Sequence, residues 1–159
     1  MAERRRLLID SCRLQCADEQ RRFALEDHES RYLRRVLRLR PDDQVDVVDG
    51  CGHLWTARLL EDHRLELCSN IEAASQQVGA PSPKLGLAIA VIRRGMDDVM
   101  RMACELGVDQ LQPIHCQRCV PQADHRPDRW RSIVQEAVEQ CERLWAPELP
   151  ELRAVDDWW

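Results

Sequence analysis

Short alternating stretches dominate the first half of the chain and predict strands. Apolar residues recur at every second position, as expected when one face of a strand is buried and the other meets water. The strand-like stretches are residues 4–9, 21–25, 44–49, 53–60 and 63–68. Gly50 and Gly52 supply a tight turn between two of them. We therefore expect a small, mostly antiparallel barrel that ends near residue 73.

Residues 28–39 interrupt these strands with a helical pattern that stops before Pro41. An apolar stripe, expected to pack on the barrel, is formed by Tyr32, Leu33, Val36 and Leu37. The flank of the same helix carries Arg31, Arg34, Arg35 and Arg38. Guanidinium groups are planar and permanently charged, so such a row suits phosphate. The alternative for a charge run of this kind is a solvated helix face.

A different pattern follows residues 75–84, which are rich in helix and strand breakers and predict an interdomain linker. Residues 85–92 are a continuous apolar run, typical of a parallel strand buried on both faces. Helical spacing then relates Met96, Val99, Met100, Ala103 and Cys104, with Gly107 as the expected C-cap. Residues 108–115 predict a second strand, which completes a β-α-β unit.

One face of a further long helix is marked by Trp130, Ile133, Val134, Ala137, Val138, Cys141 and Leu144. The fold class is therefore α+β, with a barrel domain at 1–74, a linker at 75–84 and an α/β domain at 85–159. Two parallel strands and two helices cannot cover both faces of a sheet, so the α/β domain is expected to be incomplete.

Charge divides the chain unevenly. Residues 1–40 hold eleven arginines and seven acidic residues, a balance of +4, which leaves −9 for the remainder of a chain whose net charge is −5. A basic part joined to an acidic one is typical of a protein in which one module binds a polyanion. No apolar run has membrane length and the N-terminus does not resemble a signal peptide, so we expect a cytoplasmic protein that uses no membrane.

Eight cysteines raise the question of a metal site. Cys116 and Cys119 form a C-x-x-C pair with His115 and His125 nearby, but a second pair at zinc spacing is missing. We assign no metal, and expect the cysteines to stay reduced in a cytoplasm.

Several motifs together resemble one family. Tyr32–Asp43 with Val47–Gly50 is followed by Glu105–Val108, by Gln117–Cys119, and by Glu139–Arg143 with Pro147 and Glu148. In this order and spacing they resemble the RsmE family of 16S ribosomal RNA methyltransferases, which place a methyl group on N3 of one uridine with S-adenosylmethionine as donor. The motifs extend over nearly the whole chain.

The resemblance implies a PUA-like barrel that binds RNA, joined to the first half of a SPOUT domain, an α/β fold with a trefoil knot. It also implies a homodimer, 16S rRNA or the small ribosomal subunit as partner, no DNA, and no metal cofactor. By this match the candidate RNA-binding residues are Arg34, Arg35, Arg38 and Arg40. Arg93 and Arg94 are candidates for the substrate side, since ligands gather at the carboxyl ends of strands in open α/β sheets. The alternative for these two is a surface pair near a loop.

The chain also departs from the family. Neither its Gly-Pro-Glu-Gly-Gly loop nor its later Arg-Val-Leu-Arg-Thr-Glu-Thr segment, which build the knot and hold S-adenosylmethionine, occurs in the 159 residues. We therefore expect a truncated form without cofactor-binding residues, and assign no catalytic residue. Two alternatives to a methyltransferase are a stand-alone rRNA-binding module and a fragment that folds only on a partner.

Overall fold

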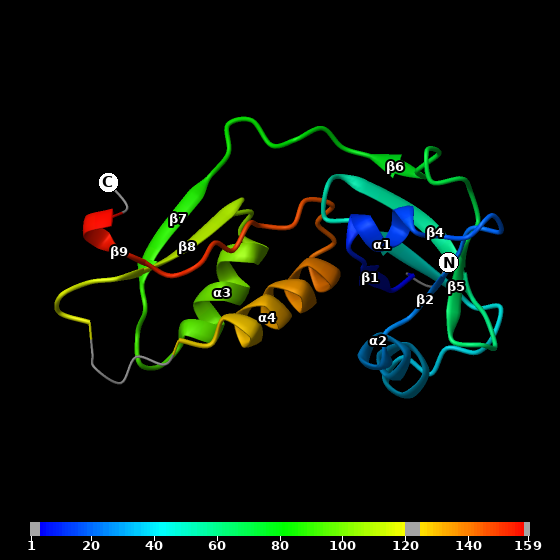
Figure 1. Ribbon diagram of the computed structural model, residues 1–159, viewed down its shortest axis with the longest axis horizontal. Helices are drawn as coiled ribbons and strands as arrows, with labels where there is room; N and C mark the ends of the chain where they lie inside the picture. The colour runs from blue at the N-terminus through cyan, green and yellow to red at the C-terminus, as the bar shows by residue number, and fades with distance from the viewer. Residues whose placement is uncertain (1–3, 120–124, 158–159) are drawn as a thin grey trace. The chain divides into compact units, whose positions relative to one another are not determined.

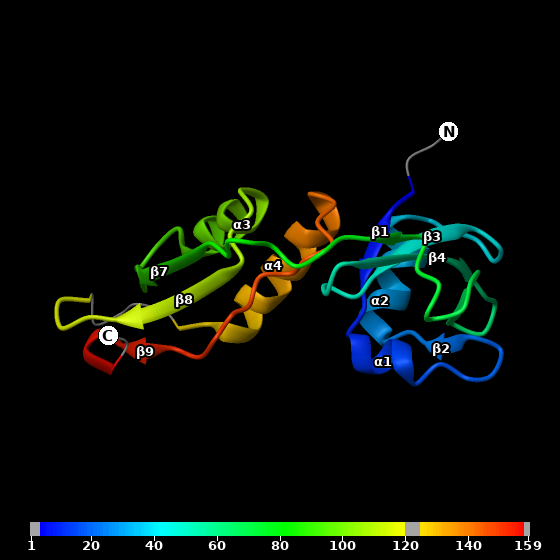
Figure 2. The same ribbon diagram turned by 90° about the horizontal axis from the view of Figure 1, so that it is seen from above.

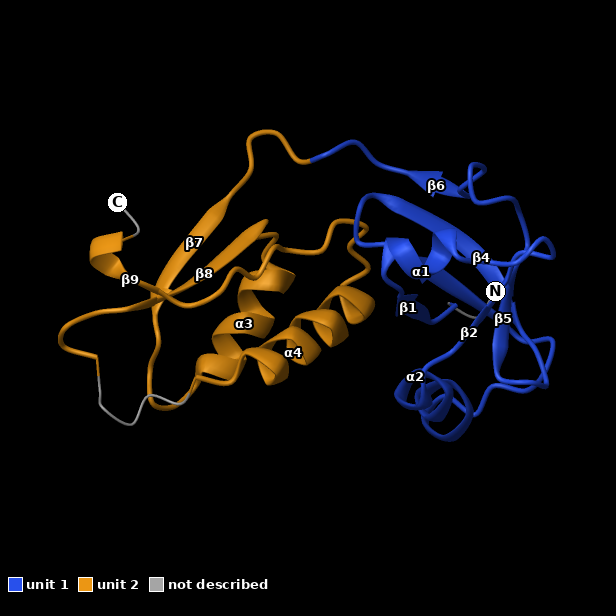
Figure 3. Ribbon diagram, in the orientation of Figure 1, with its two compact units in different colours: residues 1–80 blue, residues 81–159 orange. Residues whose placement is uncertain are grey.

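Two compact units make up the structure, a computed structural model that describes residues 4–119 and 125–157. The units comprise residues 1–80 and 81–159 (Figure 3), and each contains its own sheet. Among the described residues, no helix has the length and apolar character needed to cross a membrane.

Unit 1 is built on a six-stranded sheet with the order β1-β3-β4-β5-β2, and β6 pairs with β4 (Figure 1). The strands are β1 (Arg6–Leu8), β2 (Arg22–Ala24), β3 (Gln44–Val48), β4 (His53–Leu59), β5 (Arg64–Leu67) and β6 (Gln76–Gln77). β1 and β3 are parallel and the other pairs are antiparallel. The predicted mostly antiparallel sheet is confirmed, and each of the five predicted strands is present.

Alternation on β4 shows how the sequence produces this sheet. Trp55, Ala57 and Leu59 point to one face and are buried in the core of unit 1, whereas Arg58 between them is exposed. The helical elements of the unit are α1 (Ser11–Gln15), α2 (Asp27–Arg31) and the π-helical turn η1 (Tyr32–Val36). Helix α1 was not predicted.

The predicted linker differs from the structure at its beginning. Gln76 and Gln77 form β6, which pairs with Leu54 and His53 of β4. Breaker residues on both sides make this stretch too short for a periodic signal, and its pairing depends on a strand more than twenty residues earlier. Unit 1 therefore extends to residue 80 instead of residue 74.

Unit 2 is a three-stranded parallel sheet with the order β7-β8-β9. Its elements are β7 (Gly86–Ala90), α3 (Met96–Glu105), β8 (Gln110–His115), α4 (Pro127–Gln140), β9 (Arg153–Ala154) and the 3₁₀ turn η2 (Val155–Asp157). The β-α-β unit is confirmed, and a second crossover through α4 leads to the short strand β9, which was not predicted.

Helices α3 and α4 lie side by side along one face of this sheet (Figures 1 and 2). Sequential strands in one direction with right-handed crossovers place both helices on the same side. The prediction that residues 85–92 are buried on both faces is therefore wrong, because β7 is an edge strand and its residues 87–90 are only half-buried. Trp130, Val134 and Val138 of α4 are buried as predicted.

Arg143, just after α4, ties the end of α3 to the beginning of β8. Its guanidinium donates to the carbonyl oxygens of Cys104 at 2.9 Å and Val108 at 2.8 Å, and forms an ion pair with Asp109 at 3.0 Å. Asp109 also accepts a hydrogen bond from the Leu85 amide at 2.9 Å, so one charged pair joins three segments of unit 2.

Candidate nucleic-acid interface

Helix α2 begins with a capping box that fixes its direction. Glu29 accepts a hydrogen bond from the Glu26 amide at 2.7 Å, and the Glu26 side chain caps the first turn in return. The Glu29 carboxylate is only 2% exposed and receives two hydrogen bonds from Arg13 of α1, at 2.6 and 2.9 Å. This buried ion pair anchors α2 to the unit, and it raises the pKa of Arg13.

The π-helical turn η1 changes which side chains face the core. The Leu37 amide donates to the Tyr32 carbonyl at 3.0 Å, five residues back, so the spacing is wider than that of an α-helix. Leu33 is fully buried, and Tyr32 and Leu37 pack against the core as predicted. Val36 is 65% exposed, so the prediction that it belongs to the buried stripe is wrong. The wider turn rotates it outward.

Arg34 holds the protein together instead of extending into solvent. One terminal nitrogen of its guanidinium donates to the carbonyl oxygens of Leu60 at 2.7 Å and Glu61 at 2.9 Å, in the turn between β4 and β5. Its Nε is buried without a hydrogen-bond partner. These contacts give Arg34 a structural role in unit 1, whereas its contact with RNA stays a prediction.

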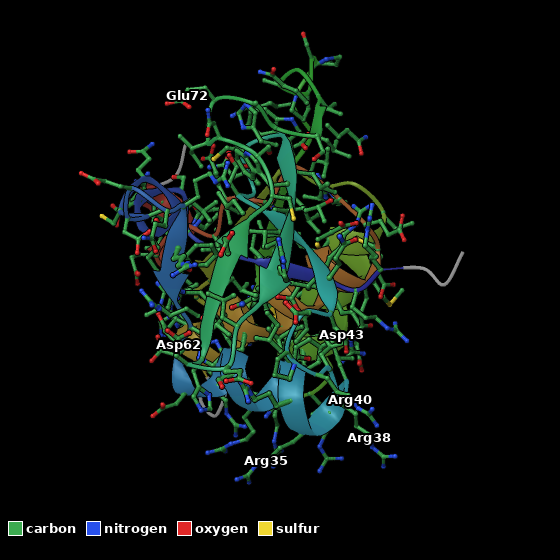
Figure 4. All side chains as sticks on the ribbon, turned by 90° about the vertical axis from the view of Figure 1, so that its right-hand side faces the viewer. Arg35, Arg38, Arg40, Asp43, Asp62 and Glu72 are labelled. Atoms are coloured by element: carbon green, nitrogen blue, oxygen red, sulfur yellow. The ribbon has the colours of Figure 1, made fainter. Side chains whose placement is uncertain are left out.

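Arg35, Arg38 and Arg40 are exposed, and none of their guanidinium groups has a hydrogen bond or ion pair within the described part of the chain. Figure 4 shows all three extending outward at the same end of unit 1. Arg38 has a φ of 57°, in the left-handed region that ends the helix. The Arg40 amide then donates to Asp43 at 2.7 Å, which closes the following turn. The fold therefore gathers three uncompensated cations from the helix end and the turn after it.

In unit 2, Arg93 and Arg94 lie in the exposed turn between β7 and α3. Neither side chain has a hydrogen bond or ion pair with any described residue. They follow the carboxyl end of β7, as predicted, and the next exposed arginine on this edge is Arg118, which follows β8. Arg118 is not among the site residues predicted from the sequence, although parallel pairing of the two predicted strands places the turns that follow them at one edge of the sheet.

The C-x-x-C pair forms a local turn, in which the Cys116 amide donates to the Cys119 sulfur at 3.1 Å. Desolvation and the neighbouring Cys119 raise the pKa of the Cys116 thiol, which makes it a poorer nucleophile and metal ligand. His125 instead packs edge-on against Trp130, with 5.3 Å between the ring centroids. Among the described residues, no three His, Cys, Asp or Glu side chains form a group that could hold a metal ion.

Comparison with known proteins assigns a family to each unit. Residues 25–71 match the RNA methyltransferase PUA domain family, and residues 80–159 match the RNA methyltransferase domain family. The ribosomal RNA small subunit methyltransferase E of Synechocystis is 38% identical over 118 residues, which are 73% of this chain and 38% of that protein. The Rickettsia conorii protein of the same name is 28% identical over 83% of this chain and 54% of its own length.

Solved structures extend the likeness to the fold. The Neisseria gonorrhoeae ribosomal RNA small subunit methyltransferase E, solved with S-adenosyl methionine, has a TM-score of 0.74 and 30% identity, over 98% of this chain and 64% of that one. A Legionella pneumophila methyltransferase, also solved with its cofactor, has a TM-score of 0.76 at 22% identity, over 99% of this chain and 66% of that one. The chain thus spans between a third and two thirds of the length of these relatives. It belongs to the RsmE family of RNA methyltransferases, with a PUA-like unit followed by a SPOUT-type α/β unit.

Proposed function

We propose that this chain binds small-subunit ribosomal RNA and belongs to a system that methylates N3 of a uridine with S-adenosylmethionine as the methyl donor. Membership of an RNA methyltransferase family supports methyl transfer as the reaction class. The relatives are ribosomal RNA small subunit methyltransferases, which supports small-subunit ribosomal RNA as the substrate. As a homodimer of the RsmE type, it would present two copies of unit 1 to the RNA. Its partner would be 16S rRNA in the cytoplasm, and it would bind neither DNA nor a membrane.

The observation that carries the proposal is the set of three unpaired arginines, Arg35, Arg38 and Arg40, at one end of the unit that matches an RNA methyltransferase PUA domain. An exposed arginine without an internal carboxylate partner keeps its full charge for a phosphate and has no ion pair to break on binding. Arg34 would act as a positioning residue, because it fixes the β4–β5 turn beneath the same helix.

Arg93 and Arg94 are proposed to face the substrate from unit 2. Loss of the N3 proton places negative charge on the uracil ring, mainly on its oxygens, and cations near those oxygens would stabilise the anion. Both side chains are exposed and unpaired among the described residues, so they are available for this role.

The two segments with which the family holds S-adenosylmethionine, Gly-Pro-Glu-Gly-Gly and Arg-Val-Leu-Arg-Thr-Glu-Thr, do not occur in the 159 residues. We therefore derive no step of methyl transfer from the described residues of unit 2.

The same observation favours a second candidate function, an RNA-binding module that acts without catalysis. In that case the arginines of unit 1 would still bind rRNA, whereas isothermal titration of the chain with S-adenosylmethionine would give no heat of binding. Micromolar binding of S-adenosylmethionine would contradict this second candidate function.

RNA binding can be tested by fluorescence anisotropy with a labelled small-subunit rRNA fragment over a range of salt concentrations. Replacing Arg35, Arg38 and Arg40 by Gln should remove about three phosphate contacts. The slope of log affinity against log salt should then become shallower by about 2 to 3, since each contact contributes roughly 0.7 to 0.9.

A matched control removes the same charge elsewhere, by replacing Arg101, Arg129 and Arg131 of α3 and α4 with Gln. Arg101 is already paired with Asp98, Arg129 with Asp97, and Arg131 with Asp128. Equal loss of affinity in both variants would mean that net charge alone drives binding. An unchanged salt slope in the first variant would contradict the proposed interface.

A further inference from the structure

A hollow of about 230 Å³ lies in unit 1 between α1, β4 and the segment that leads into β6. Leu14, Trp55 and Ile71 provide its apolar wall. The Trp55 indole N–H donates to the Ile71 carbonyl at 3.1 Å, so its polar edge is satisfied within the protein. The proposed RNA interface does not use this hollow. In Figure 4, Glu72 on its rim lies at the opposite end of unit 1 from Arg35.

One wall of the hollow is a chain of three hydrogen-bonded side chains. Asp49 and His53 Nδ1 are 2.7 Å apart, and the Gln77 amide nitrogen is 3.1 Å from His53 Nε2. A neutral imidazole fits both contacts, because it donates from Nδ1 and accepts at Nε2. The His53 ring also packs on Trp55, with 5.7 Å between the centroids. Asp49 additionally accepts from the amides of Cys51 and His53, so this wall is fixed before any ligand arrives.

The hollow is acidic. Asp49 and Glu72 line it, and no lysine or arginine is found among its described lining residues. The pKa of the nearby Cys51 thiol is raised first by burial and then by the charges of Asp49 and Asp10. A phosphate group would be repelled here, which distinguishes this end of unit 1 from the end that carries Arg35.

Several acceptors around the hollow have no partner of their own. The side chains of Ser11, Gln15 and Glu72 make no hydrogen bond or ion pair within the described part of the protein. They place one hydroxyl, one amide and one carboxylate group with available acceptor oxygens around the apolar wall, beside the carboxylate of Asp49, whose oxygens are already engaged by Cys51 and His53. A complementary ligand therefore has a flat or apolar stem, several N–H donors and a positive charge.

We propose that this hollow binds the guanidinium group of an arginine presented by a basic segment of a partner protein. Guanidinium is flat, so it can lie against an aromatic ring, and its N–H donors match the acceptor oxygens of Ser11, Gln15 and Glu72, while its charge matches the acidic lining. Unit 1 would then hold RNA phosphates at its basic end and a basic protein segment at its acidic end. The proposal does not rest on RNA binding or on methyl transfer.

The test is an NMR titration of the ¹⁵N-labelled full chain with the peptide acetyl-Gly-Arg-Gly-amide. The indole N–H of Trp55 and the side-chain amide of Gln77 should shift in a saturable and salt-sensitive manner. The peptide in which citrulline replaces arginine has nearly the same shape but no charge, and should bind at least tenfold more weakly. Equal binding of the citrulline peptide would overturn the proposal.

Two matched variants locate the site. Glu72→Gln removes an exposed carboxylate from the rim. It should lower the affinity for the arginine peptide by about threefold, the effect typical of one exposed ion pair. Glu19→Gln removes an exposed carboxylate outside the hollow and should have no effect. Equal affinity of wild type and Glu72→Gln would refute the charge argument. If cytidine monophosphate shifted the same resonances and the arginine peptide did not, the hollow would be a nucleic-acid-binding site instead.

Discussion

The contacts of Arg143 with Cys104, Val108 and Asp109, here called the Arg143 clamp, are expected to stabilise unit 2 strongly. In Arg143→Met the aliphatic stem is kept, but the ion pair with Asp109 and the hydrogen bonds to the Cys104 and Val108 carbonyls are lost. The side chains of Arg143 and Asp109 are 15% and 10% exposed, so water can replace few of these contacts. Breaking a buried pair on one side costs about 3–5 kcal/mol, because the remaining charge has no partner.

Hydrogen exchange measured by mass spectrometry assigns this loss to one unit. Amides of α3 and α4 that exchange through unfolding of unit 2 should exchange about 100 to 4,000 times faster in Arg143→Met, since 1.4 kcal/mol is a factor of ten. Amides of β3 and β4 in unit 1 provide the internal reference. Asp109→Asn in the Arg143→Met background should restore part of the protection, because the unpaired charge is then removed.

The matched control is Arg101→Met on α3, whose exposed ion pair with Asp98 should change exchange little. If Arg143→Met exchanged within threefold of the wild type, the network around Asp109 would not be a stabilising clamp, and our interpretation of these contacts would be wrong.

Three further predictions concern buried groups. Arg13→Met should lower the free energy of unfolding of unit 1 by about 3 kcal/mol in urea titrations, because Glu29 keeps a buried charge without its partner; an unchanged unfolding midpoint would contradict this. Leu33→Ala should cost about 2–5 kcal/mol in the same assay, whereas Val36→Lys should change stability by no more than about 0.5 kcal/mol, because only Leu33 is buried. An equal loss of stability in both variants would mean that Val36 is buried as well, as an α-helical spacing predicts. Burial raises the pKa of Cys104 to about 12, so it should be the last cysteine to react with iodoacetamide at pH 8. Since the raised pKa favours the neutral thiol in the folded state, the resulting stabilisation is present below pH 9 and should be lost as the pH rises toward 12; early alkylation of Cys104 would show that it is not buried.

Periodicity predicted the elements whose side chains repeat over several residues. Trp130, Val134 and Val138 repeat over two turns of α4, and Trp55, Ala57 and Leu59 alternate along β4, so the sequence carries enough signal for both. Helix α1 has only five residues and one buried side chain, Leu14, which is too little for a periodic signal.

The candidate interface shows a different limit. Sequence reasoning singled out the arginine row from its composition, and the structure separates its members by hydrogen bonding. Arg34 donates hydrogen bonds to the carbonyls of Leu60 and Glu61, more than twenty-five residues away. A local sequence pattern cannot predict such a long-range contact. Val36 was wrongly predicted to be buried, because the sequence does not distinguish a π-helical turn from an α-helical one.

The pairing of the first two strands has a consequence for synthesis on the ribosome. β1 finds its partner in β3, where Arg6 lies opposite Asp46, and β2 finds its partner in β5, where Arg22 lies opposite Glu66. The two earliest strands therefore leave the exit tunnel well before any strand that pairs with them. Until residue 67 has emerged, β2 has no partner strand and stays accessible to the chaperones that bind exposed nascent segments. The arginine-bearing helix, which follows β2, has no completed sheet to pack on during this time.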